Sequence, residues 1–169
     1  MNKILESKIY TLDVLKASCD QWRNEKCKIV FTNGCFDILH EGHVRYLTEA
    51  KSLGDKLIVG LNADDSVKKL KGPNRPINKA SSRAIVLAGL MSTDAIIVFG
   101  EETPFELISS LLPDILVKGG DWKTKDIVGS DVVLDHGGKV FSLTFHEGHS
   151  TSLVEQKIKK NPDETSRAH

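Results

Sequence analysis

The chain has 169 residues, the size of one ordinary domain, and can bury a sizeable core. Because 23 Lys and Arg residues balance 23 Asp and Glu residues, the composition argues against the broad basic surface of a nucleic-acid binder. The three cysteines, Cys19, Cys27 and Cys35, lack C-x-x-C spacing, which argues against a disulfide framework or a zinc cage and favours a reducing compartment.

The N-terminal segment is interrupted by charges and has no long apolar run, so neither a signal peptide nor a membrane span is expected. We therefore expect a cytoplasmic protein. From Thr11 to about Glu25 the apolar residues recur at spacings of three and four, which predicts an amphipathic helix. We assign residues 1–26 to an N-terminal lead-in helix, and this helix, with Trp22, could pack on a second subunit of a homodimer or higher homo-oligomer.

Five short apolar runs rich in Val, Ile and Phe follow along the chain. Such runs are typical of strands buried on both faces of a parallel sheet. They are KIVFT (28–32), KLIVGL (56–61), AIIVFG (95–100), DILVKG (114–119) and KVFSLTF (139–145).

Helical patterns separate these strands. The first is marked by Val44, Leu47, Ala50 and Leu53, the second by Ile85, Leu87, Ala88 and Met91, and the third by Thr103 as N-cap, Pro104 and Glu106. The alternation predicts an α/β fold, a Rossmann-like, doubly wound, five-stranded parallel sheet with helices on both faces. We expect one domain over residues 27–160 and a flexible tail over 161–169.

The tetrapeptide HEGH occurs twice, at residues 40–43 and 146–149. The first copy follows a strand and a loop that contains Gly34, and it begins a helix. In an open parallel sheet, ligands bind beyond the carboxyl ends of the strands, where helix N-termini present N–H groups and a positive dipole end. The sequence therefore predicts an anion site at this loop.

Within the first HEGH, His40 and His43 can lie on one helix face, and Gly42 leaves no side chain in the way of a phosphate. A zinc protease would need histidines four apart and a third ligand, so we expect no metal held by this pair. Two solvent-facing histidines at a helix cap are the other alternative. The Walker pattern G-x-x-x-x-G-K-[ST] does not occur in the chain.

The segment TNGCFDILHEGH (32–43) resembles the signature of the nucleotidyltransferase superfamily that includes cytidylyltransferases and pantetheine-phosphate adenylyltransferase. The resemblance extends over about residues 26–160. Four further segments resemble the adenylyltransferase domain of ADP-heptose synthases, which make ADP-glycero-manno-heptose for bacterial surface polysaccharide, such as lipopolysaccharide, from ATP and heptose 1-phosphate. They are LKGPNRPIN (70–78), LPDILVKGGDW (112–122), GSDVV (129–133) and GGKVFSL (137–143).

The reaction that this resemblance implies is attack by a sugar-phosphate oxygen on the α-phosphorus of ATP, with release of pyrophosphate. A phosphate monoester has its second pKa near ~6, so the nucleophile is ionised without a general base. Positioning and positive groups should then supply most of the rate enhancement. Magnesium is expected to arrive with ATP and needs no cage of protein ligands. Because many relatives carry a fused sugar kinase, we expect a separate kinase to supply the substrate.

The resemblance also implies roles for individual residues. The expected catalytic residues are His40, His43 and Lys71, and the expected sugar-phosphate contacts are Asp37, Arg75 and Trp122. The expected nucleotide contacts are Thr32, Asn33, Gly34, Phe36, Gly42, Arg83, Lys118, Gly119, Asp121, Ser150, Thr151 and Ser152.

Several of these residues also have a structural interpretation. Asp37 could brace its loop, Arg83 could form an internal ion pair, and Trp122 could serve in packing alone. The paired lysines Lys68 and Lys69, which precede Lys71, could form a solvated face.

The second HEGH directly follows the last predicted strand and continues into Ser150, Thr151 and Ser152, which are N-cap residues for a terminal helix. We interpret these hydroxyls as its functional part and the histidines His146 and His149 as incidental. Glycerol-3-phosphate cytidylyltransferases carry an arginine where this chain has Phe145, which favours the adenylyltransferase. The alternatives are a cytidylyltransferase acting on a polyol phosphate such as glycerol 3-phosphate, and a catalytically silent nucleotide-binding protein.

Overall fold

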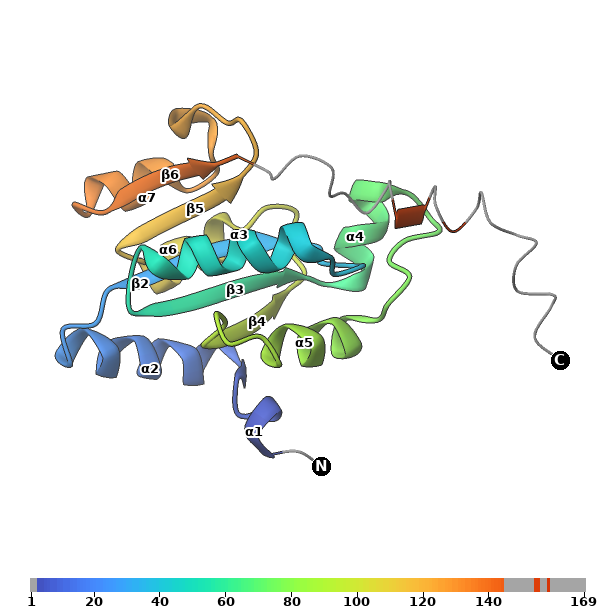
Figure 1. The fold of residues 1–169 in the computed structure, drawn as a ribbon. Coiled ribbons are helices and arrows are strands. Elements are labelled where there is room, and N and C mark those ends of the chain that lie inside the picture. Colours follow the sequence, from blue (N-terminus) through green and yellow to red (C-terminus); the bar gives the residue numbers. More distant parts are fainter. Residues whose placement is uncertain (1–2, 145–153, 156–157, 159–169) are drawn as a thin grey trace, which may run out of the picture.

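The computed structural model describes residues 3–144, 154–155 and 158 (Figure 1). The strands are β1 (Ile9–Tyr10), β2 (Ile29–Gly34), β3 (Lys56–Asn62), β4 (Ala95–Phe99), β5 (Ile115–Gly119) and β6 (Lys139–Leu143). The helices are α1 (Lys3–Glu6), α2 (Leu12–Asn24), α3 (Glu41–Ser52), α4 (Asp64–Lys71), α5 (Ala80–Ala88), α6 (Phe105–Leu111), the 3₁₀ helix η1 (Thr124–Asp126) and α7 (Ser130–Asp135).

Within the described residues, the strands form one parallel sheet in the order β1-β4-β3-β2-β5-β6. The predicted α/β class and doubly wound topology are confirmed, but the predicted count of five strands is wrong. The sixth strand is β1, in which Ile9 and Tyr10 pair with Ile96 and Ile97 of β4. Two residues are too few to show a hydrophobic pattern, so this strand could not be predicted from its residues alone.

The strand order reverses at β2, which has β3 on one side and β5 on the other. The chain builds outward from β2 to β4, then crosses back to place β5 and β6 on the other side. Such a reversal opens a crevice beyond the carboxyl ends of the two central strands. The candidate site must therefore be sought where β2 and β5 end.

Helices cover both faces of the sheet, as predicted (Figure 1). Helices α3 and α5 pack on one face around Leu47, Val59 and Leu87, and helices α2, α6 and α7 pack on the other around Phe31 and Ile108. Each face therefore has its own apolar layer, and β2 to β5 between them are largely buried, as their apolar runs predicted. The edge strand β6 has no buried residue, so the prediction that its run is buried on both faces is wrong.

Helix α2 confirms the predicted lead-in helix, but its tryptophan does not form an external surface. Leu15, Cys19 and Trp22 all lie in the apolar layer beneath α2, and Trp22 is only 9% exposed. Trp22 therefore does not take part in the expected contact of this helix with a second subunit, and that contact stays a prediction. The three cysteines are free thiols, and among the described residues no helix combines the length and apolar character needed to cross a bilayer.

Three predicted details also differ from the structure. Helix α6 begins at Phe105 with Pro104 in the N-cap position, so Thr103 does not cap it as expected. Met91 lies beyond the end of α5 and is 98% exposed, so it is not part of that helix. Lys71, expected on a loop, is the last residue of α4.

Candidate active site

The loop from β2 into α3 lies at the carboxyl edge of the sheet, as the sequence predicted. His40 has an extended backbone (φ −143°, ψ 172°) and occupies the N-cap position of α3, and its carbonyl accepts hydrogen bonds from the backbone N–H groups of His43 and Val44. No side chain caps this helix at His40. The start of α3 therefore presents the positive end of its dipole beside the histidine pair.

The two histidines of the first HEGH are stacked closely. The ring centroids of His40 and His43 lie 3.9 Å apart at an interplanar angle of 35°. The ring of Phe36 meets His43 edge-on at 5.4 Å. Phe36 in turn occupies the space above Gly34, where an added Cβ would come within 2.9 Å of the phenyl ring. Gly34 is thus needed to seat the ring that supports His43.

His43 is poorly solvated in this arrangement. Burial, together with the nearby His40 and the charge of Lys71, lowers the pKa of His43 to about 4. The ring is therefore neutral at pH 7. Its Nδ1 is buried without a hydrogen-bond partner among the described residues. A negatively charged group placed here would counteract the positive charges of His40 and Lys71 and raise this pKa.

Tyr46 links the ends of the two central strands. Its hydroxyl lies 2.6 Å from Oγ1 of Thr32 on β2 and hydrogen-bonds the backbone of Gly119 on β5. Burial raises the pKa of Tyr46 to about 12. Thr32, an expected nucleotide contact, is completely buried. The sequence analysis missed Tyr46, although a tyrosine on the buried face of a helix needs a partner for its hydroxyl.

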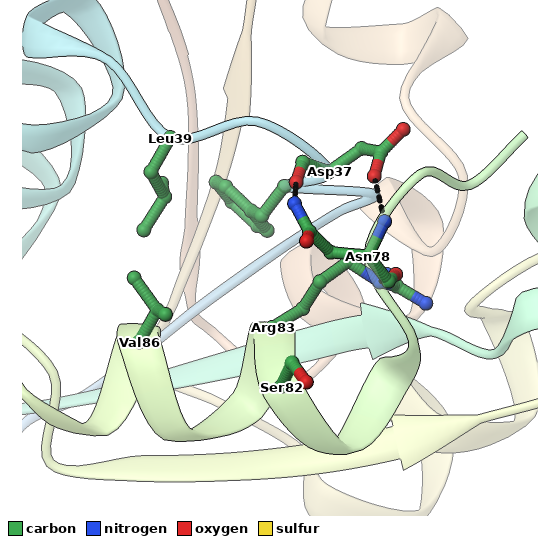
Figure 2. A pocket seen from close by; sticks show the side chains of 7 residues that line it. Asp37, Leu39, Asn78, Ser82, Arg83 and Val86 are labelled. Carbon is green, nitrogen blue, oxygen red and sulfur yellow. Dashed lines mark hydrogen bonds between the residues drawn. The ribbon is translucent and has the colours of Figure 1, made fainter. Parts of the chain in front are cut away.

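Asp37 forms hydrogen bonds with the loop that follows α4 (Figure 2). Its carboxylate accepts hydrogen bonds from the backbone N–H groups of Ile77 and Asn78 at 2.9 Å each, and its carbonyl accepts one from Nδ2 of Asn78 at 2.8 Å. Burial alone would raise the pKa of Asp37, but these backbone bonds and the charge of Arg75 lower it. These contacts favour the bracing interpretation over a direct contact with sugar.

Arg75 lies between two carboxylates. Its Nη1 is 2.6 Å from Oδ2 of Asp37, and its Nη2 is 2.6 Å from Oε1 of Glu155. Arg75 therefore connects Glu155, which follows the second HEGH in the sequence, to the β2–α3 loop. In this state both carboxylates neutralise the cation that was expected to bind sugar phosphate.

Arg83 is buried and fully occupied by protein acceptors. Its guanidinium donates to the carbonyl oxygens of Asn78 at 2.9 Å and Cys35 at 2.6 Å, and to Oδ1 of Asp64 at 2.7 Å. Only 1% of the residue is exposed. It also lines a small cavity of about 100 Å³ beside Asp37 (Figure 2). These contacts favour the alternative of an internal ion pair.

The remaining expected residues follow β5. Lys118 lies 3.4 Å from Oδ1 of Asn33, and burial lowers its pKa. Trp122 is half exposed, and its indole N–H donates to the carbonyl of Gly119 at 3.1 Å. Asp121 is exposed.

The structure therefore gathers the first HEGH, Lys71 and Lys118 around one sheet edge, since both lysines act electrostatically on Cys35. The hydroxyls Ser150, Thr151 and Ser152, together with His146 and His149, lie outside the described residues. Among residues 3–144, 154–155 and 158, no three His, Cys, Asp or Glu side chains gather as metal ligands would.

Comparison with known proteins agrees with this geometry. Residues 31–157 match the cytidylyltransferase-like family model. The chain is 54% identical over 153 residues to the bifunctional protein HldE of Wolinella succinogenes, covering 90% of this chain and 31% of that protein. It is 59% identical over 136 residues to HldE of Pasteurella multocida, covering 80% of this chain and 29% of that protein. The chain thus spans about a third of the length of these curated relatives.

Solved structures show a similar fold. A lipopolysaccharide core biosynthesis protein from Thermoplasma volcanium superimposes with a TM-score of 0.57 at 28% identity, covering 73% of this chain and 99% of that one. Pantoate-beta-alanine ligase from Francisella tularensis, solved with a nucleotide and beta-alanine, has the same TM-score at 15% identity. The match covers 89% of this chain and 76% of that one. The second likeness concerns the fold alone.

Proposed function

The chain belongs to the cytidylyltransferase-like family, and we propose that it transfers AMP from ATP to D-glycero-D-manno-heptose 1-phosphate, giving ADP-heptose and pyrophosphate. The observation that carries this proposal is the stacked pair His40 and His43 at the start of α3, beside the ends of β2 and β5. The substrate pair is supported by the segments that resemble ADP-heptose synthases and by the relatives named HldE.

The proposed reaction forms one bond and breaks one. An oxygen of the sugar 1-phosphate attacks the α-phosphorus of ATP, and the bond from that phosphorus to the bridging oxygen of the β-phosphate breaks. Pyrophosphate leaves with the electron pair. Because the nucleophile is already ionised near neutral pH, the protein needs to position two anions and stabilise the charge between them.

We assign the phosphate contacts to the histidine pair and Lys71. As the triphosphate approaches, its charge raises the pKa of His43, so the ring can gain a proton and donate hydrogen bonds to the phosphoryl oxygens. Lys71 lies at the end of α4, just before Gly72, whose backbone has a φ of 99°. This junction allows the lysine to move over the phosphates without unfolding α4.

Other expected residues receive supporting roles in this proposal. Thr32, Asp37 and Arg83 hold the loops in place. Thr32 bonds to Tyr46, and Asp37 bonds to residues within 75–78. Arg83 donates to Asn78, Cys35 and Asp64. Arg75 keeps its ion pair with Asp37, and the substrate phosphate replaces Glu155 as its second partner. The proposed nucleotide contacts remain Asn33, Gly34, Phe36, Gly42, Lys118, Gly119, Asp121 and, from sequence alone, Ser150, Thr151 and Ser152.

Magnesium belongs to the proposed reaction as a companion of ATP. Imidazoles and lysines lie around the start of α3, the carboxylate of Glu41 is paired with Arg45, and the carboxylate of Asp37 has no exposed surface. This donor set fits a magnesium ion held by triphosphate oxygens and water, and it does not fit one held by protein carboxylates. The ion would neutralise part of the triphosphate charge while the protein residues orient the phosphates.

We further propose that a sugar kinase supplies the heptose 1-phosphate, that the reaction takes place in the cytoplasm, and that the protein forms a homo-oligomer. The first two follow from the substrates and the reducing compartment that the free cysteines favour. The oligomer remains a prediction from the sequence, without the contribution of Trp22.

Pyrophosphate release tests this function. Purified protein is offered ATP, CTP, GTP or UTP, each with heptose 1-phosphate, a hexose 1-phosphate or glycerol 3-phosphate. We expect turnover with ATP and heptose 1-phosphate to exceed every other combination. Turnover with CTP and glycerol 3-phosphate, but not with ATP and heptose 1-phosphate, would establish the alternative cytidylyltransferase.

A further inference from the structure

The two central strands separate before they end. β2 pairs with β3 along its whole length, and β5 pairs with β6 along its whole length. Between β2 and β5 the described pairing stops at Thr32 and Val117, so residues 33–34 and 118–119 diverge. We call this divergence the split. It lies where the strand order reverses, which is where open α/β sheets bind their ligands.

One backbone hydrogen bond of the β2–β5 ladder is missing at the split. In a parallel ladder, alternate residues of a strand turn their N–H and C=O groups to the same neighbour. The N–H of Gly120 donates to Leu143 on the β6 side, so the N–H of Gly119 points towards β2. The next ladder bond would join this N–H to the carbonyl of Asn33, but the described pairing has already ended.

The hydroxyl of Tyr46 takes the place of the missing acceptor. Burial raises the pKa of Tyr46 to about 12, and a hydrogen bond with the backbone of Gly119 opposes that rise. An N–H group that donates to the phenol oxygen has this effect, because it stabilises the phenolate. The same oxygen lies 2.6 Å from Oγ1 of Thr32. One side chain of α3 thus spans the split and bonds to both central strands.

Tyr46 also connects the split to the histidine pair. It follows His43 by three residues on α3, a spacing that places both side chains on one side of the helix. Its ring is only 5% exposed and packs in the apolar layer that contains Val30 and Val117. The bonds of its hydroxyl therefore fix this part of α3, and with it the imidazole of His43, relative to the ends of β2 and β5.

We propose that Tyr46 is a positioning residue for the transfer reaction, because its hydroxyl keeps the split open and holds His43 in place beside it. The inference rests on the proposed function, in which Asn33 and Gly119 contact the nucleotide. Because Tyr46 accepts the hydrogen bond from Gly119, the carbonyl of Asn33 is left unused by the β2–β5 ladder. It can then accept a hydrogen bond from an N–H or O–H group of the nucleotide.

Loss of the hydroxyl should affect the reaction rate more than the stability. In Tyr46→Phe the N–H of Gly119 can turn to the carbonyl of Asn33, so that one hydrogen bond replaces another. The split would then narrow, and the strand ends would no longer fit the nucleotide. A misplacement of about 1 Å can cost on the order of 10²-fold in rate, although the fold is retained.

Three variants test this role in single-turnover formation of ADP-heptose. The chain has two tyrosines, and Tyr10 lies on the edge strand β1, so Tyr10→Phe is the matched control. Thr32→Val removes the partner on β2 but keeps the bond between Tyr46 and Gly119. We expect Tyr46→Phe to slow the transfer on the order of 10- to 100-fold. Thr32→Val should slow it less than about threefold, and Tyr10→Phe should leave it unchanged.

Two kinetic results would overturn the proposal. Equal losses in Tyr46→Phe and Thr32→Val would place the effect in the bond to Thr32, and an unchanged rate in Tyr46→Phe would leave the hydroxyl with a role in packing alone. The loss should also persist at saturating ATP and heptose 1-phosphate, because it reflects alignment and not affinity. Thermal melts set the assay temperature well below the unfolding transition of each variant.

The wild-type protein supplies a test that needs neither a variant nor turnover. Amide hydrogen exchange at Gly119 is followed by NMR, with and without a non-hydrolysable ATP analogue. We expect this amide to be protected in both states, because its acceptor is Tyr46 and not the nucleotide. Exchange at the rate of an open peptide in the unliganded protein would overturn the proposal.

Failure of this role and failure of the proposed function give different results. A wild type that forms no ADP-heptose would reject the proposed function, and the variants are then compared with whichever substrate pair the wild type turns over in the pyrophosphate assay. An active wild type with an unprotected Gly119, or a fully active Tyr46→Phe, would reject the role of Tyr46 and leave the function standing.

Discussion

Arg75 and Asp37 form a buried ion pair, with Nη1 of the arginine 2.6 Å from Oδ2 of the aspartate and no exposed surface on the aspartate side chain. The other guanidinium nitrogen of Arg75 lies 2.6 Å from Glu155. Asp37 belongs to the β2–α3 loop and Glu155 to the C-terminal segment, so one guanidinium ties both to the loop after α4. These are the parts of the chain proposed to surround the phosphates.

Removing the charge of Asp37 should destabilise the protein. Asp37→Asn leaves Arg75 without its buried partner and should lower the free energy of unfolding by about 3 kcal/mol. Chemical denaturation at pH 7 measures this, with Asp65→Asn as control because Asp65 is 88% exposed in its pair with Lys68. Equal effects of the two substitutions would contradict the bracing role.

The same pair predicts a dependence on acid. Because the pKa of Asp37 is lowered in the fold, its contribution to stability is present above the unfolded pKa of about 3.9 and is lost as the pH falls through the lower folded value. Below pH 4 the wild type should therefore lose stability more steeply than Asp37→Asn. Parallel curves in that range would show that the carboxylate is not specially stabilised.

Glu155 should compete with substrate for Arg75. Glu155→Gln removes the outer charge of the pair, so the KM for the anionic acceptor should fall about two- to fivefold, the scale of an ion pair worth up to about 1 kcal/mol. Steady-state kinetics with Glu106→Gln, an exposed acid on α6, provide the control. An unchanged or raised KM would limit Arg75 to a structural role.

Arg83→Lys tests whether the buried arginine serves the fold. A lysine cannot donate to all three acceptors in the geometry of a guanidinium, so unfolding should become easier by about 2–3 kcal/mol. Arg45→Lys, at an exposed pair with Glu41, should change stability by less than about 0.5 kcal/mol. If Arg83→Lys keeps wild-type stability but weakens ATP binding, the arginine contacts the nucleotide instead.

His43 makes stability and binding depend on pH. Its pKa is about 4 in the fold and about 6.5 in an unfolded chain, so between these values the unfolded state takes up a proton that the folded state does not. Stability is full above pH ~6.5 and falls as the pH drops towards 4, and His43→Asn should flatten this fall. Histidine NMR should show the pKa of His43 rising when an ATP analogue binds. A ring that titrates near 6.5 in the unliganded protein would contradict this environment.

The sequence predicted those features that depend on local pattern. The five apolar runs predicted β2 to β6, and the loop between Gly34 and His40 predicted the place of the candidate site, because both signals lie within single short segments. The strand at Ile9 and Tyr10 was missed because it exists only through pairing with β4. The other edge strand, β6, was predicted from its apolar run, so the missing signal of β1 comes from its length of two residues.

Site roles were harder to predict because they depend on distant partners. Asp37 is satisfied by Ile77 and Asn78, about 40 positions away, and no spacing rule relates these segments. Arg83 reaches back to Cys35 in the same way. The role of Tyr46 was missed because the partners of its hydroxyl lie on β2 and β5, which become neighbours only in the folded sheet. Contacts between elements therefore decide which charged residues are paired within the fold.

The most direct test compares the two HEGH copies in single-turnover formation of ADP-heptose from ATP and heptose 1-phosphate. His43→Ala removes a proposed phosphate donor at the start of α3 and should slow the reaction on the order of 10²- to 10³-fold. His149→Ala should leave the rate nearly unchanged, with circular dichroism showing that both variants are folded. Equal losses in the two variants, or a loss only in His149→Ala, would contradict a reaction centred on the first histidine pair.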